Sequence, residues 1–392
     1  MAWEERTVEK VREEFVRRAL AHEKSKIELC REYQISRPTG DKWIKRYMQG
    51  EPCTNRSRRP QNFPNRIDGW VEEEIVRLRQ RYPALGAVKL HKIMENMGYK
   101  ELPCARTINN VLQRNGLIDI EASRAATPHK RFEKSKANDM WQADFKGHFP
   151  LENGKRCHTL NILDDHSRYN LCIEALENEK YPTVIPVFTR LFQEYGLPFS
   201  LLCDNGNPWG TAQSTGYTKF EVWLMELGVL TLHGRPWHPQ TQGKEERFNR
   251  SFTRECLQGK SFRDHEDAQQ QFDFYRSFYN NERPHFALEL EVPASQYEPS
   301  PRKMPERIEP WEYGSEYSLC KVKETGFFHY RGQGYFLSEA FGGKTIGVRE
   351  SHLPGQITLV FRQLRIGRID LDSRCYTSRK AYLLEGDPRQ KV

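Results

Sequence analysis

This 392-residue sequence lacks closely paired cysteines, long apolar runs and an apolar leader. Its nine cysteines are scattered without a Cys-x-x-Cys pair, a pattern that favours neither a zinc knuckle nor a disulfide framework. No apolar stretch approaches the ~20 residues that cross a bilayer. The N-terminal MAWEERTVEK has no signal-peptide apolar region. We therefore expect a cytoplasmic protein with reduced thiols and no membrane partner.

Most of the chain also lacks a net positive charge. Residues 138–392 contain 32 Lys and Arg against 34 Asp and Glu, whereas residues 1–137 contain 29 against 19. A basic N-terminal third favours a polyanion partner, because neutralised phosphates release their counterions. A basic surface that serves only solubility is the alternative, and charge alone does not decide between them.

The length exceeds that of one domain, which usually runs to roughly 100–200 residues. Composition and periodicity divide the chain into modules separated by proline-containing or arginine-containing segments. We expect helix-turn-helix domains at 1–50 and 67–117, linkers at 51–66, 118–137 and 291–316, an α/β catalytic core at 138–290, a small β-barrel at 317–372 and a tail at 373–392.

The first helix-turn-helix is predicted by three short amphipathic stretches within residues 4–48, with Ser25 and Ser36 as helix caps. The third stretch is basic, and its candidate DNA contacts are Arg37, Thr39, Lys42, Lys45 and Arg46. The segment that follows is rich in arginine. Its Arg56, Arg58 and Arg59 suit an arm in the minor groove, with a solvated tether as the alternative.

A second three-helix pattern follows, with helices expected at 70–82, 88–97 and 106–115. The last of these offers Arg106, Asn109, Asn110, Gln113 and Arg114 on its polar faces as candidate DNA contacts. Two readers in tandem suit a long, specific DNA site. A helical module that binds only protein is the alternative.

Beyond residue 138 the pattern changes to strands and helices in alternation. Strands are expected at 141–149, 158–164, 169–175, 199–203 and 229–232, and helices near 183–195, 218–227, 243–258 and 264–282. Pro186 is expected in the first turn of its helix, where a missing amide costs nothing. This order predicts an α/β fold with a mixed sheet. Short β-rich runs and glycine turns after residue 317 predict the small β-barrel.

Three acids occupy positions that burial and strand propensity disfavour unless something compensates their charge. Asp144 lies within a strand, Asp204 directly follows an apolar strand, and Glu246 lies at the start of a helix. Each alone is best explained as a capped or paired carboxylate. Together, converging carboxylates favour a bound cation, and oxygen ligands suit two Mg²⁺ or Mn²⁺ ions that catalyse phosphodiester displacement.

The motifs WQADFKG (141–147), LDDHSR (163–168), CDNG (203–206), HPQTQGKEERFN (238–249) and YNNERPH (279–285) resemble the integrase core of bacterial insertion-sequence transposases. The resemblance covers about residues 138–300 and implies an RNase H-like fold with Asp144, Asp204 and Glu246 as catalytic metal ligands. The C-terminal region resembles the SH3-like domains of integrases only in outline. One departure is the 41-residue spacer between the second and third acids, longer than the family often has, which a loop at Pro208–Thr218 can absorb.

The third acid has a neighbour, Glu245, that helical periodicity places nearer the buried Phe248 and Phe252 stripe. The family pattern instead assigns the acid directly before Arg247, which is Glu246.

Other polar residues near these motifs have alternative roles. Asp164 and Asp165 are expected to serve a turn with Ser167 or Arg168, and His233 is not expected to bind zinc. His238, Lys244 and Arg247 are candidate contacts to the DNA backbone, with helix solvation as the alternative for the last two.

The sequence thus predicts a nucleoid-associated bacterial transposase that binds the terminal inverted repeats of its element and cleaves and joins strands. Its expected partners are repeat DNA, target DNA and at least one further copy of itself, with no small-molecule substrate. The alternatives are a catalytically inactive DNA-binding regulator derived from such an enzyme, and an RNase H-like nuclease.

Overall fold

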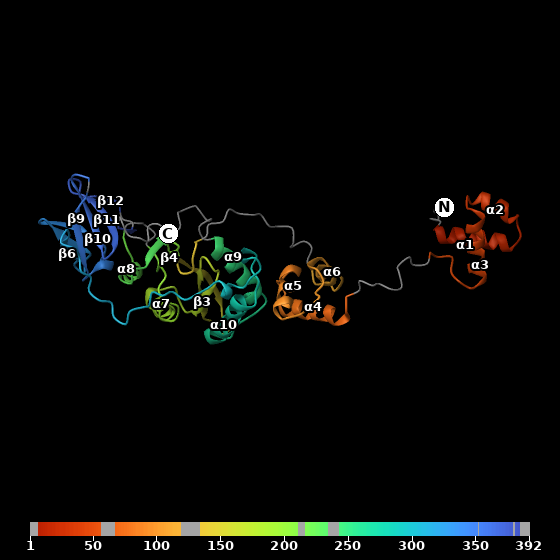
Figure 1. The fold of residues 1–392 in the computed structure, drawn as a ribbon, viewed down its shortest axis with the longest axis horizontal. Helices are drawn as coiled ribbons and strands as arrows, with labels where there is room; N and C mark the ends of the chain where they lie inside the picture. The colour runs from red at the N-terminus through yellow and green to blue at the C-terminus, as the bar shows by residue number, and fades with distance from the viewer. Residues whose placement is uncertain are drawn as a thin grey trace. The chain divides into compact units, whose positions relative to one another are not determined.

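The computed structural model describes residues 7–55, 67–118, 134–210, 216–233, 243–351, 353–378 and 381–384. The chain separates into two compact units, Met1–Arg66 and Ile67–Val392. Each has its own core, so each is described by itself (Figure 1).

The first unit contains three helices, α1 (Val8–Leu20), α2 (Lys26–Glu32) and α3 (Arg37–Met48), which we call the first helical module. Ser25 and Ser36 cap α2 and α3 as expected, each side chain accepting a hydrogen bond from a backbone amide. Gly40 lets α3 pack closely, since a Cβ there would lie 2.8 Å from the Cys30 Sγ and 3.0 Å from the Phe15 ring.

The second unit begins with another three helices, α4 (Gly69–Arg81), α5 (Ala87–Asn96) and α6 (Ala105–Arg114). These form the second helical module, residues 67–118. Its apolar positions at helical spacing, such as Ile75, Leu90 and Ile108, are fully buried.

A five-stranded mixed sheet follows, in the order β3-β2-β1-β4-β5. β1 pairs antiparallel with β2 and parallel with β4, and β4 pairs parallel with β5. The strands are β1 (Met140–Pro150), β2 (Arg156–Asp164), β3 (Asn170–Leu176), β4 (Ser200–Cys203) and β5 (Leu230–His233).

Helices cover both faces of this sheet. α7 (Tyr181–Tyr195) and α8 (Lys219–Glu226) share a core with Trp141, Ala143 and Leu160. α9 (Gly243–Phe252), the π-helical turn η3 (Thr253–Leu257) and α10 (His265–Asn281) pack on the other face. The expected first-turn position of Pro186 is wrong: α7 begins at Tyr181, so Pro182 occupies the first turn and Pro186 lies inside the helix. Five strands between two helical layers make the α/β fold that alternation predicted.

The expected closed barrel at the C-terminus is not confirmed. Its strands form an open sheet, β12-β11-β10-β9-β6, with β13 paired to β11, and a separate β7–β8 hairpin. Along the part of the chain described, β6 and β12 end this sheet without pairing to each other. Short strands and glycine turns are common to barrels and open sheets, so the pattern could not predict closure. The strands are β6 (Ser318–Lys321), β7 (Phe327–Tyr330), β8 (Gln333–Phe336), β9 (Thr345–Glu350), β10 (Gln356–Phe361), β11 (Leu364–Asp370), β12 (Tyr376–Ser378) and β13 (Tyr382–Leu383). The short 3₁₀ turns η4 (Phe286–Leu288) and η5 (Pro293–Ser295) follow α10, and η6 (Glu339–Phe341) lies between β8 and β9.

The proline-rich segment before these strands packs on the α/β domain. Tyr297 stacks on Tyr169 at 4.4 Å between ring centroids, and the Ser300 amide donates to the Tyr195 carbonyl. Arg302 donates to the carbonyls of Pro198 and Gly228. This part of the expected linker is therefore a strap bound to the domain. Among the described residues, no helix combines the length and apolarity that crossing a bilayer requires.

Candidate active site

Asp144 lies in the middle of β1, half-buried, opposite Asn161 of β2. Strand alternation puts Trp141 and Ala143 in the core on the α7 side, so Asp144 faces the α9 side. There the Asn249 side chain of α9 donates a 2.8 Å hydrogen bond to the Asp144 Oδ2. The Asn161 side chain donates to Asn249 in turn, at 2.5 Å.

Asn249 is a site residue that the sequence reasoning missed. It ties α9 to β1 and holds the Asp144 carboxylate in one orientation. A signal was present in the motif itself, because Asn249 closes HPQTQGKEERFN and lies one helical turn after the paired glutamates.

Asp204 immediately follows β4, at the carboxyl end of a parallel strand, where open α/β sheets bind their ligands. The parallel register pairs Gln142 with Leu202, and two further residues bring position 204 beside position 144. The Asp204 side chain is exposed and accepts a hydrogen bond from the Gly206 amide at 3.0 Å.

Half-buried His233 and buried Glu221 fix the backbone of Asp204. The His233 Nδ1 lies 2.8 Å from the Asp204 carbonyl, and its Nε2 lies 3.0 Å from the Glu221 carboxylate. Burial alone would lower the pKa of His233, but these two acceptors raise it above its ordinary value. A protonated imidazole donates to both, so His233 has a structural role at the end of β5.

The charge of Asp204 acts on Asp144. Burial and then the charge of Asp204 raise the pKa of Asp144 to about 6, against the Asn249 hydrogen bond, which lowers it. A cation bound at Asp144 would relieve this repulsion and favour its ionised form. The oxygen ligands of the two carboxylates fit Mg²⁺ or Mn²⁺ better than zinc.

The third carboxylate is less well placed. Glu246 is exposed, whereas Glu245 is 1% exposed, and neither carboxylate oxygen of Glu245 has a hydrogen-bond partner among the described residues. Burial and then the charge of Asp144 raise the pKa of Glu245 well above its ordinary value. The periodicity prediction that Glu245 shares the buried stripe of Phe248 and Phe252 is confirmed.

Within the described ranges, no three His, Cys, Asp or Glu side chains are grouped closely enough to hold a metal ion. Residues 234–242, directly before α9, lie outside those ranges. The oxygen donors of Asp144 and Asp204 are of the kind that a divalent cation such as Mg²⁺ prefers.

The candidate DNA contacts on the two modules lie mostly at the surface. On α3, Arg37, Lys42 and Lys45 are exposed, while Thr39 is hydrogen-bonded to Ser36 and Arg46 is half-buried against Trp43. On α6 the five candidates, Arg106, Asn109, Asn110, Gln113 and Arg114, are all exposed, and Arg114 pairs with Glu72. Arg56, Arg58, Arg59 and His238 lie outside the described residues.

Near the acids, Arg247 is exposed, but Lys244 already has a partner. Its Nζ lies 2.6 Å from the buried Asp165 carboxylate. Asp164 accepts hydrogen bonds from the Ser167 amide and hydroxyl, so its expected role in the turn is confirmed.

The YNNERPH segment supports the site instead of forming it. The Asn280 side chain both accepts from and donates to the backbone of Asn170, fixing α10 to β3. Arg283 makes a bidentate, buried ion pair with Glu255 of η3, at 2.7 and 2.8 Å. These contacts hold α9 and η3 against α10 and so define the direction of the helix that carries the glutamates.

Comparisons with known protein families agree with this topology. The integrase core domain matches residues 134–239 and, in a second form, 227–293. A helix-turn-helix domain matches residues 11–60, and the C-terminal domain of the IS481 family of transposases matches 318–377. The α/β domain is thus an RNase H-like integrase core. Part by part, the chain matches the domains of insertion-sequence transposases of the integrase superfamily.

Individual relatives are distant. A 39.2 kDa protein of insertion element IS476 from Xanthomonas euvesicatoria is 24% identical over 53% of this chain and 54% of its own length. A 31.7 kDa protein of insertion element IS407 from Burkholderia multivorans is 25% identical over 59% and 82%. A putative transposase of IS5376 from Geobacillus stearothermophilus is 27% identical over 45% and 44%. The chain therefore spans about half the length of two of these three relatives.

Solved structures show weaker likeness. The HTLV-2 integrase catalytic core domain in complex with magnesium is 14% identical, covering 41% of this chain and 97% of its own, with a TM-score of 0.30. The simian T-cell lymphotropic virus intasome in complex with a PP2A regulatory subunit is 14% identical, covering 73% and 91%, with a TM-score of 0.36. Structural similarity at this level indicates nothing about function.

Proposed function

We propose that this protein binds the terminal inverted repeats of its mobile element and catalyses metal-dependent cleavage and joining of DNA strands. The observation that carries the proposal is the pair of carboxylates, Asp144 on β1 and Asp204 directly after the adjacent parallel strand β4, with the charge of Asp204 raising the pKa of Asp144. Glu246, assigned by the family pattern, is the proposed third metal ligand.

The chemistry that two bound Mg²⁺ or Mn²⁺ ions supply at such a site is activation of a water or 3′-hydroxyl and stabilisation of the leaving oxygen. The chain's own residues position the ligands. Asn249 orients Asp144, and His233 with Glu221 fixes the Asp204 backbone. Positioning and charge account for most of catalysis in phosphoryl transfer, which suits this arrangement.

DNA binding is assigned to the exposed polar faces of α3 and α6, with the arginines of residues 51–66 as a further contact. Arg247 and His238 are proposed to contact the substrate backbone near the acids. Lys244 could do so only by leaving Asp165. Because one site acts on one phosphodiester at a time and an element has two ends, the active species is proposed to be at least a dimer.

The test uses the full-length chain and DNA carrying the element's end, with Mg²⁺ or Mn²⁺. We expect Asp144→Asn and Asp204→Asn each to abolish cleavage and strand transfer while leaving end binding unchanged, because ligation needs the carboxylate charge and the DNA-reading helices lie elsewhere. Chelation of the metal should have the same effect.

Glu266→Gln is the matched control, since Glu266 is an exposed acid on α10 of the same domain. It should cleave like the wild type. Cleavage by either aspartate variant at the wild-type rate would disprove the site. A wild type that binds end DNA but never cuts it would identify a non-catalytic regulator, and preferential cutting of RNA–DNA hybrids would identify a nuclease.

A further inference from the structure

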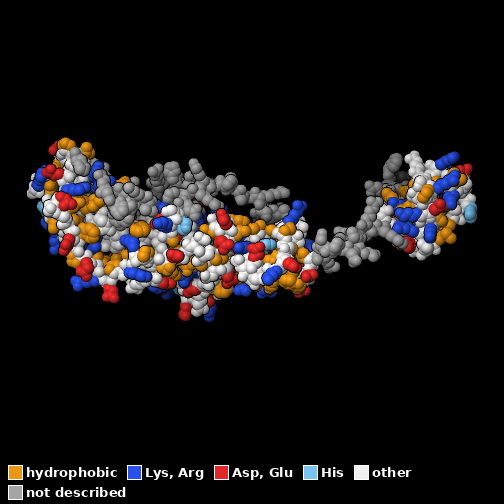
Figure 2. Space-filling model, in the orientation of Figure 1, with side chains coloured by type: hydrophobic (Ala, Val, Ile, Leu, Met, Phe, Trp, Pro, Cys, Tyr) orange, Lys and Arg blue, Asp and Glu red, His pale blue; other side chains and the backbone are white. Residues whose placement is uncertain are grey.

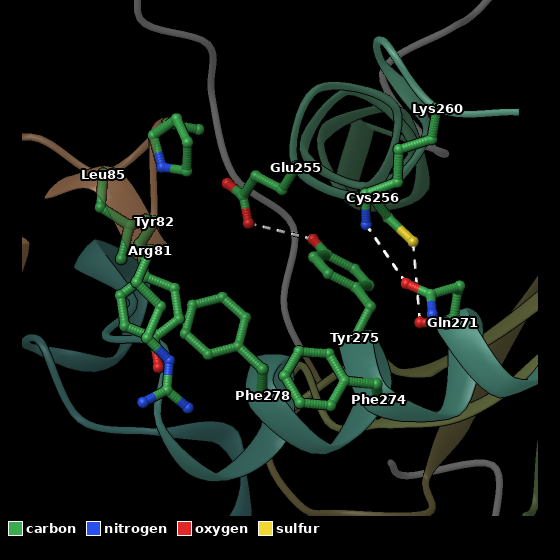
Figure 3. A pocket seen from close by; sticks show the side chains of 12 residues that line it. Arg81, Tyr82, Leu85, Glu255, Cys256, Lys260, Gln271, Phe274, Tyr275 and Phe278 are labelled. Carbon is green, nitrogen blue, oxygen red and sulfur yellow. Dashed lines mark hydrogen bonds between the residues drawn. The ribbon is translucent and has the colours of Figure 1, made fainter. Parts of the chain in front are cut away.

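The second helical module contacts the catalytic domain through an aromatic stack. Tyr82, at the end of α4, lies against Phe278 of α10 with ring centroids 4.4 Å apart and planes 10° apart (Figure 3). The Tyr82 hydroxyl also donates a 2.8 Å hydrogen bond to the Glu282 carboxylate, just beyond α10. An offset stack with a hydroxyl anchor fixes both the distance and the tilt of the two helices.

A second contact lies farther along the module. Lys92 of α5 forms a 2.9 Å ion pair with Glu291, and the Lys89 ammonium lies 5.4 Å from the centre of the Phe286 ring. Both partners belong to the segment that follows α10. Two polar contacts from different helices restrict the rotation of the module against the domain.

Between the module and the domain the packing is incomplete. A cavity of about 110 Å³ separates the α4–α5 turn from η3 and α10, and its lining includes Arg81, Leu85, Cys256, Gln271 and Phe274. Figure 3 shows these side chains arranged around the open space. Buried residues of the module and of α9, η3 and α10 belong to one hydrophobic cluster, which holds the two parts together. Apolar packing has little directional preference, so the hydrogen bond of Tyr82 and the ion pair of Lys92 are the directional contacts that select one orientation of the module.

The same module presents the exposed polar face of α6, including Asn109, Asn110 and Gln113. When α6 contacts DNA bases while its module is held against the catalytic domain, the distance from those bases to the acids is fixed. The bases that α6 contacts then determine which phosphodiester lies at the acids.

We propose that Tyr82 and Lys92 are positioning residues that fasten the second helical module to the catalytic domain and thereby set the position at which DNA is cut. This inference rests on the proposed function. It assigns to the module a role in choosing the cleaved bond, beyond affinity for the repeat.

A charge exchange tests the proposal. Full-length wild type, Lys92→Glu, Glu291→Lys and the double variant are compared on end DNA with Mn²⁺, and the cut positions are mapped by sequencing the 3′ ends. Repulsion in each single variant should lower the fraction of cuts at the wild-type position roughly two- to fivefold, the range expected for a surface pair. The double variant should restore that fraction, because it re-forms the ion pair with its charges exchanged.

Gel-shift affinity for end DNA, measured in parallel, separates positioning from binding and should stay within about twofold in all four proteins. Tyr82→Phe keeps the stack and removes the bond to Glu282, so it should also spread the cut positions. Unchanged cut positions in active single variants would overturn this inference alone. Failure of the wild type to cut would overturn the proposed function, and this inference with it.

Discussion

At the scale of single residues, the site depends on where strand register and helical periodicity place a few carboxylates. Asp144 and Asp204 come together because β1 and β4 are parallel and in register. Asn249 then holds one of the two acids with a hydrogen bond that ionised carboxylates accept well. The glutamates of α9 differ from these two, since the helix buries one and exposes the other.

The paired glutamates give the first prediction at this scale. We expect Glu246→Gln to eliminate strand transfer and Glu245→Gln to leave most of it, because the acid before Arg247 matches the family pattern and stands at the exposed rim of α9. Glu245 lies in the apolar stripe, where no described residue forms a hydrogen bond with its carboxylate, so its amide variant removes a buried acid. Strand-transfer assays on both variants decide the matter. The reverse result would make Glu245, which the structure places under the influence of Asp144, the third ligand.

Lys89 gives a prediction about pH. Burial, followed by the nearby Arg283 and Arg247 and opposed by Glu255, lowers its pKa to about 7. The unfolded lysine titrates near 10.4, so between these values the unfolded state binds the extra proton and stability rises with pH. Lys89→Met should therefore increase resistance to urea most at about pH 6, and the gain should shrink towards about pH 10.

Lys92→Met is the control on the same helix. Glu291 raises the pKa of Lys92, so removing its charge should weaken the protein slightly below that pKa, the opposite sign. Equal gains for Lys89→Met at both pH values would show that its charge carries no penalty in the folded protein.

At the scale of elements, η3 and α10 together support α9, the helix that carries the paired glutamates. Phe248 and Phe252 pack α9 onto α10, and η3 continues the chain directly from α9. The Arg283–Glu255 pair closes this arrangement, with both side chains at most 10% exposed. A buried ion pair of this kind is costly to break, because the remaining charge has no partner.

We expect Arg283→Met to lower the free energy of unfolding by about 3–5 kcal/mol, since it leaves Glu255 buried and unpaired. Arg263→Met is the matched control on the neighbouring pair with Asp267. There the arginine side chain is 74% exposed, so the loss should stay below ~1 kcal/mol. Urea denaturation of the full-length proteins measures both. Similar losses for the two variants would contradict the structural role assigned to the YNNERPH segment.

At the scale of the whole molecule, charge is distributed unevenly along the chain. The excess of Lys and Arg lies in residues 1–137, which include the first unit and the second helical module at the start of the second unit. Figure 2 shows Lys and Arg on the visible face of the first helical module, while acidic and basic side chains mix over the second unit. If the helical modules bind DNA as proposed, this distribution adds affinity by counterion release without attracting DNA to every surface.

This charge distribution predicts a steep salt dependence. Affinity of the full-length chain for end DNA should fall as salt rises, and Lys42→Ala with Lys45→Ala should reduce the slope of log affinity against log salt by about 2. Lys24→Ala is the control. Lys24 belongs to the same module but lies outside α3, and it forms an ion pair with Glu32 of α2. An unaltered slope in the double variant would remove α3 from the DNA interface.

Local patterns alone determined most elements of this protein. Serine caps predicted the starts of α2 and α3, and the order of strands and helices predicted the mixed sheet. The position of Asp144 within a strand and of Asp204 directly after one also agrees with the prediction. These features depend on residues that are close together in the chain, and the sequence gives their spacing directly. The motifs also sufficed to indicate the family.

Tertiary structure decided what depends on residues far apart. Asn249 reaches Asp144 across 105 positions, Tyr82 reaches Glu282 across 200, and the strap residue Ser300 lies against Tyr195. The open C-terminal sheet is of the same kind, because closure depends on whether the first and last strands meet. The periodicity of the sequence does not indicate such contacts, because each depends on how whole elements pack against one another after they have formed. Which glutamate of α9 faces Asp144 belongs to this second group, and there the packing and the motif point to different residues.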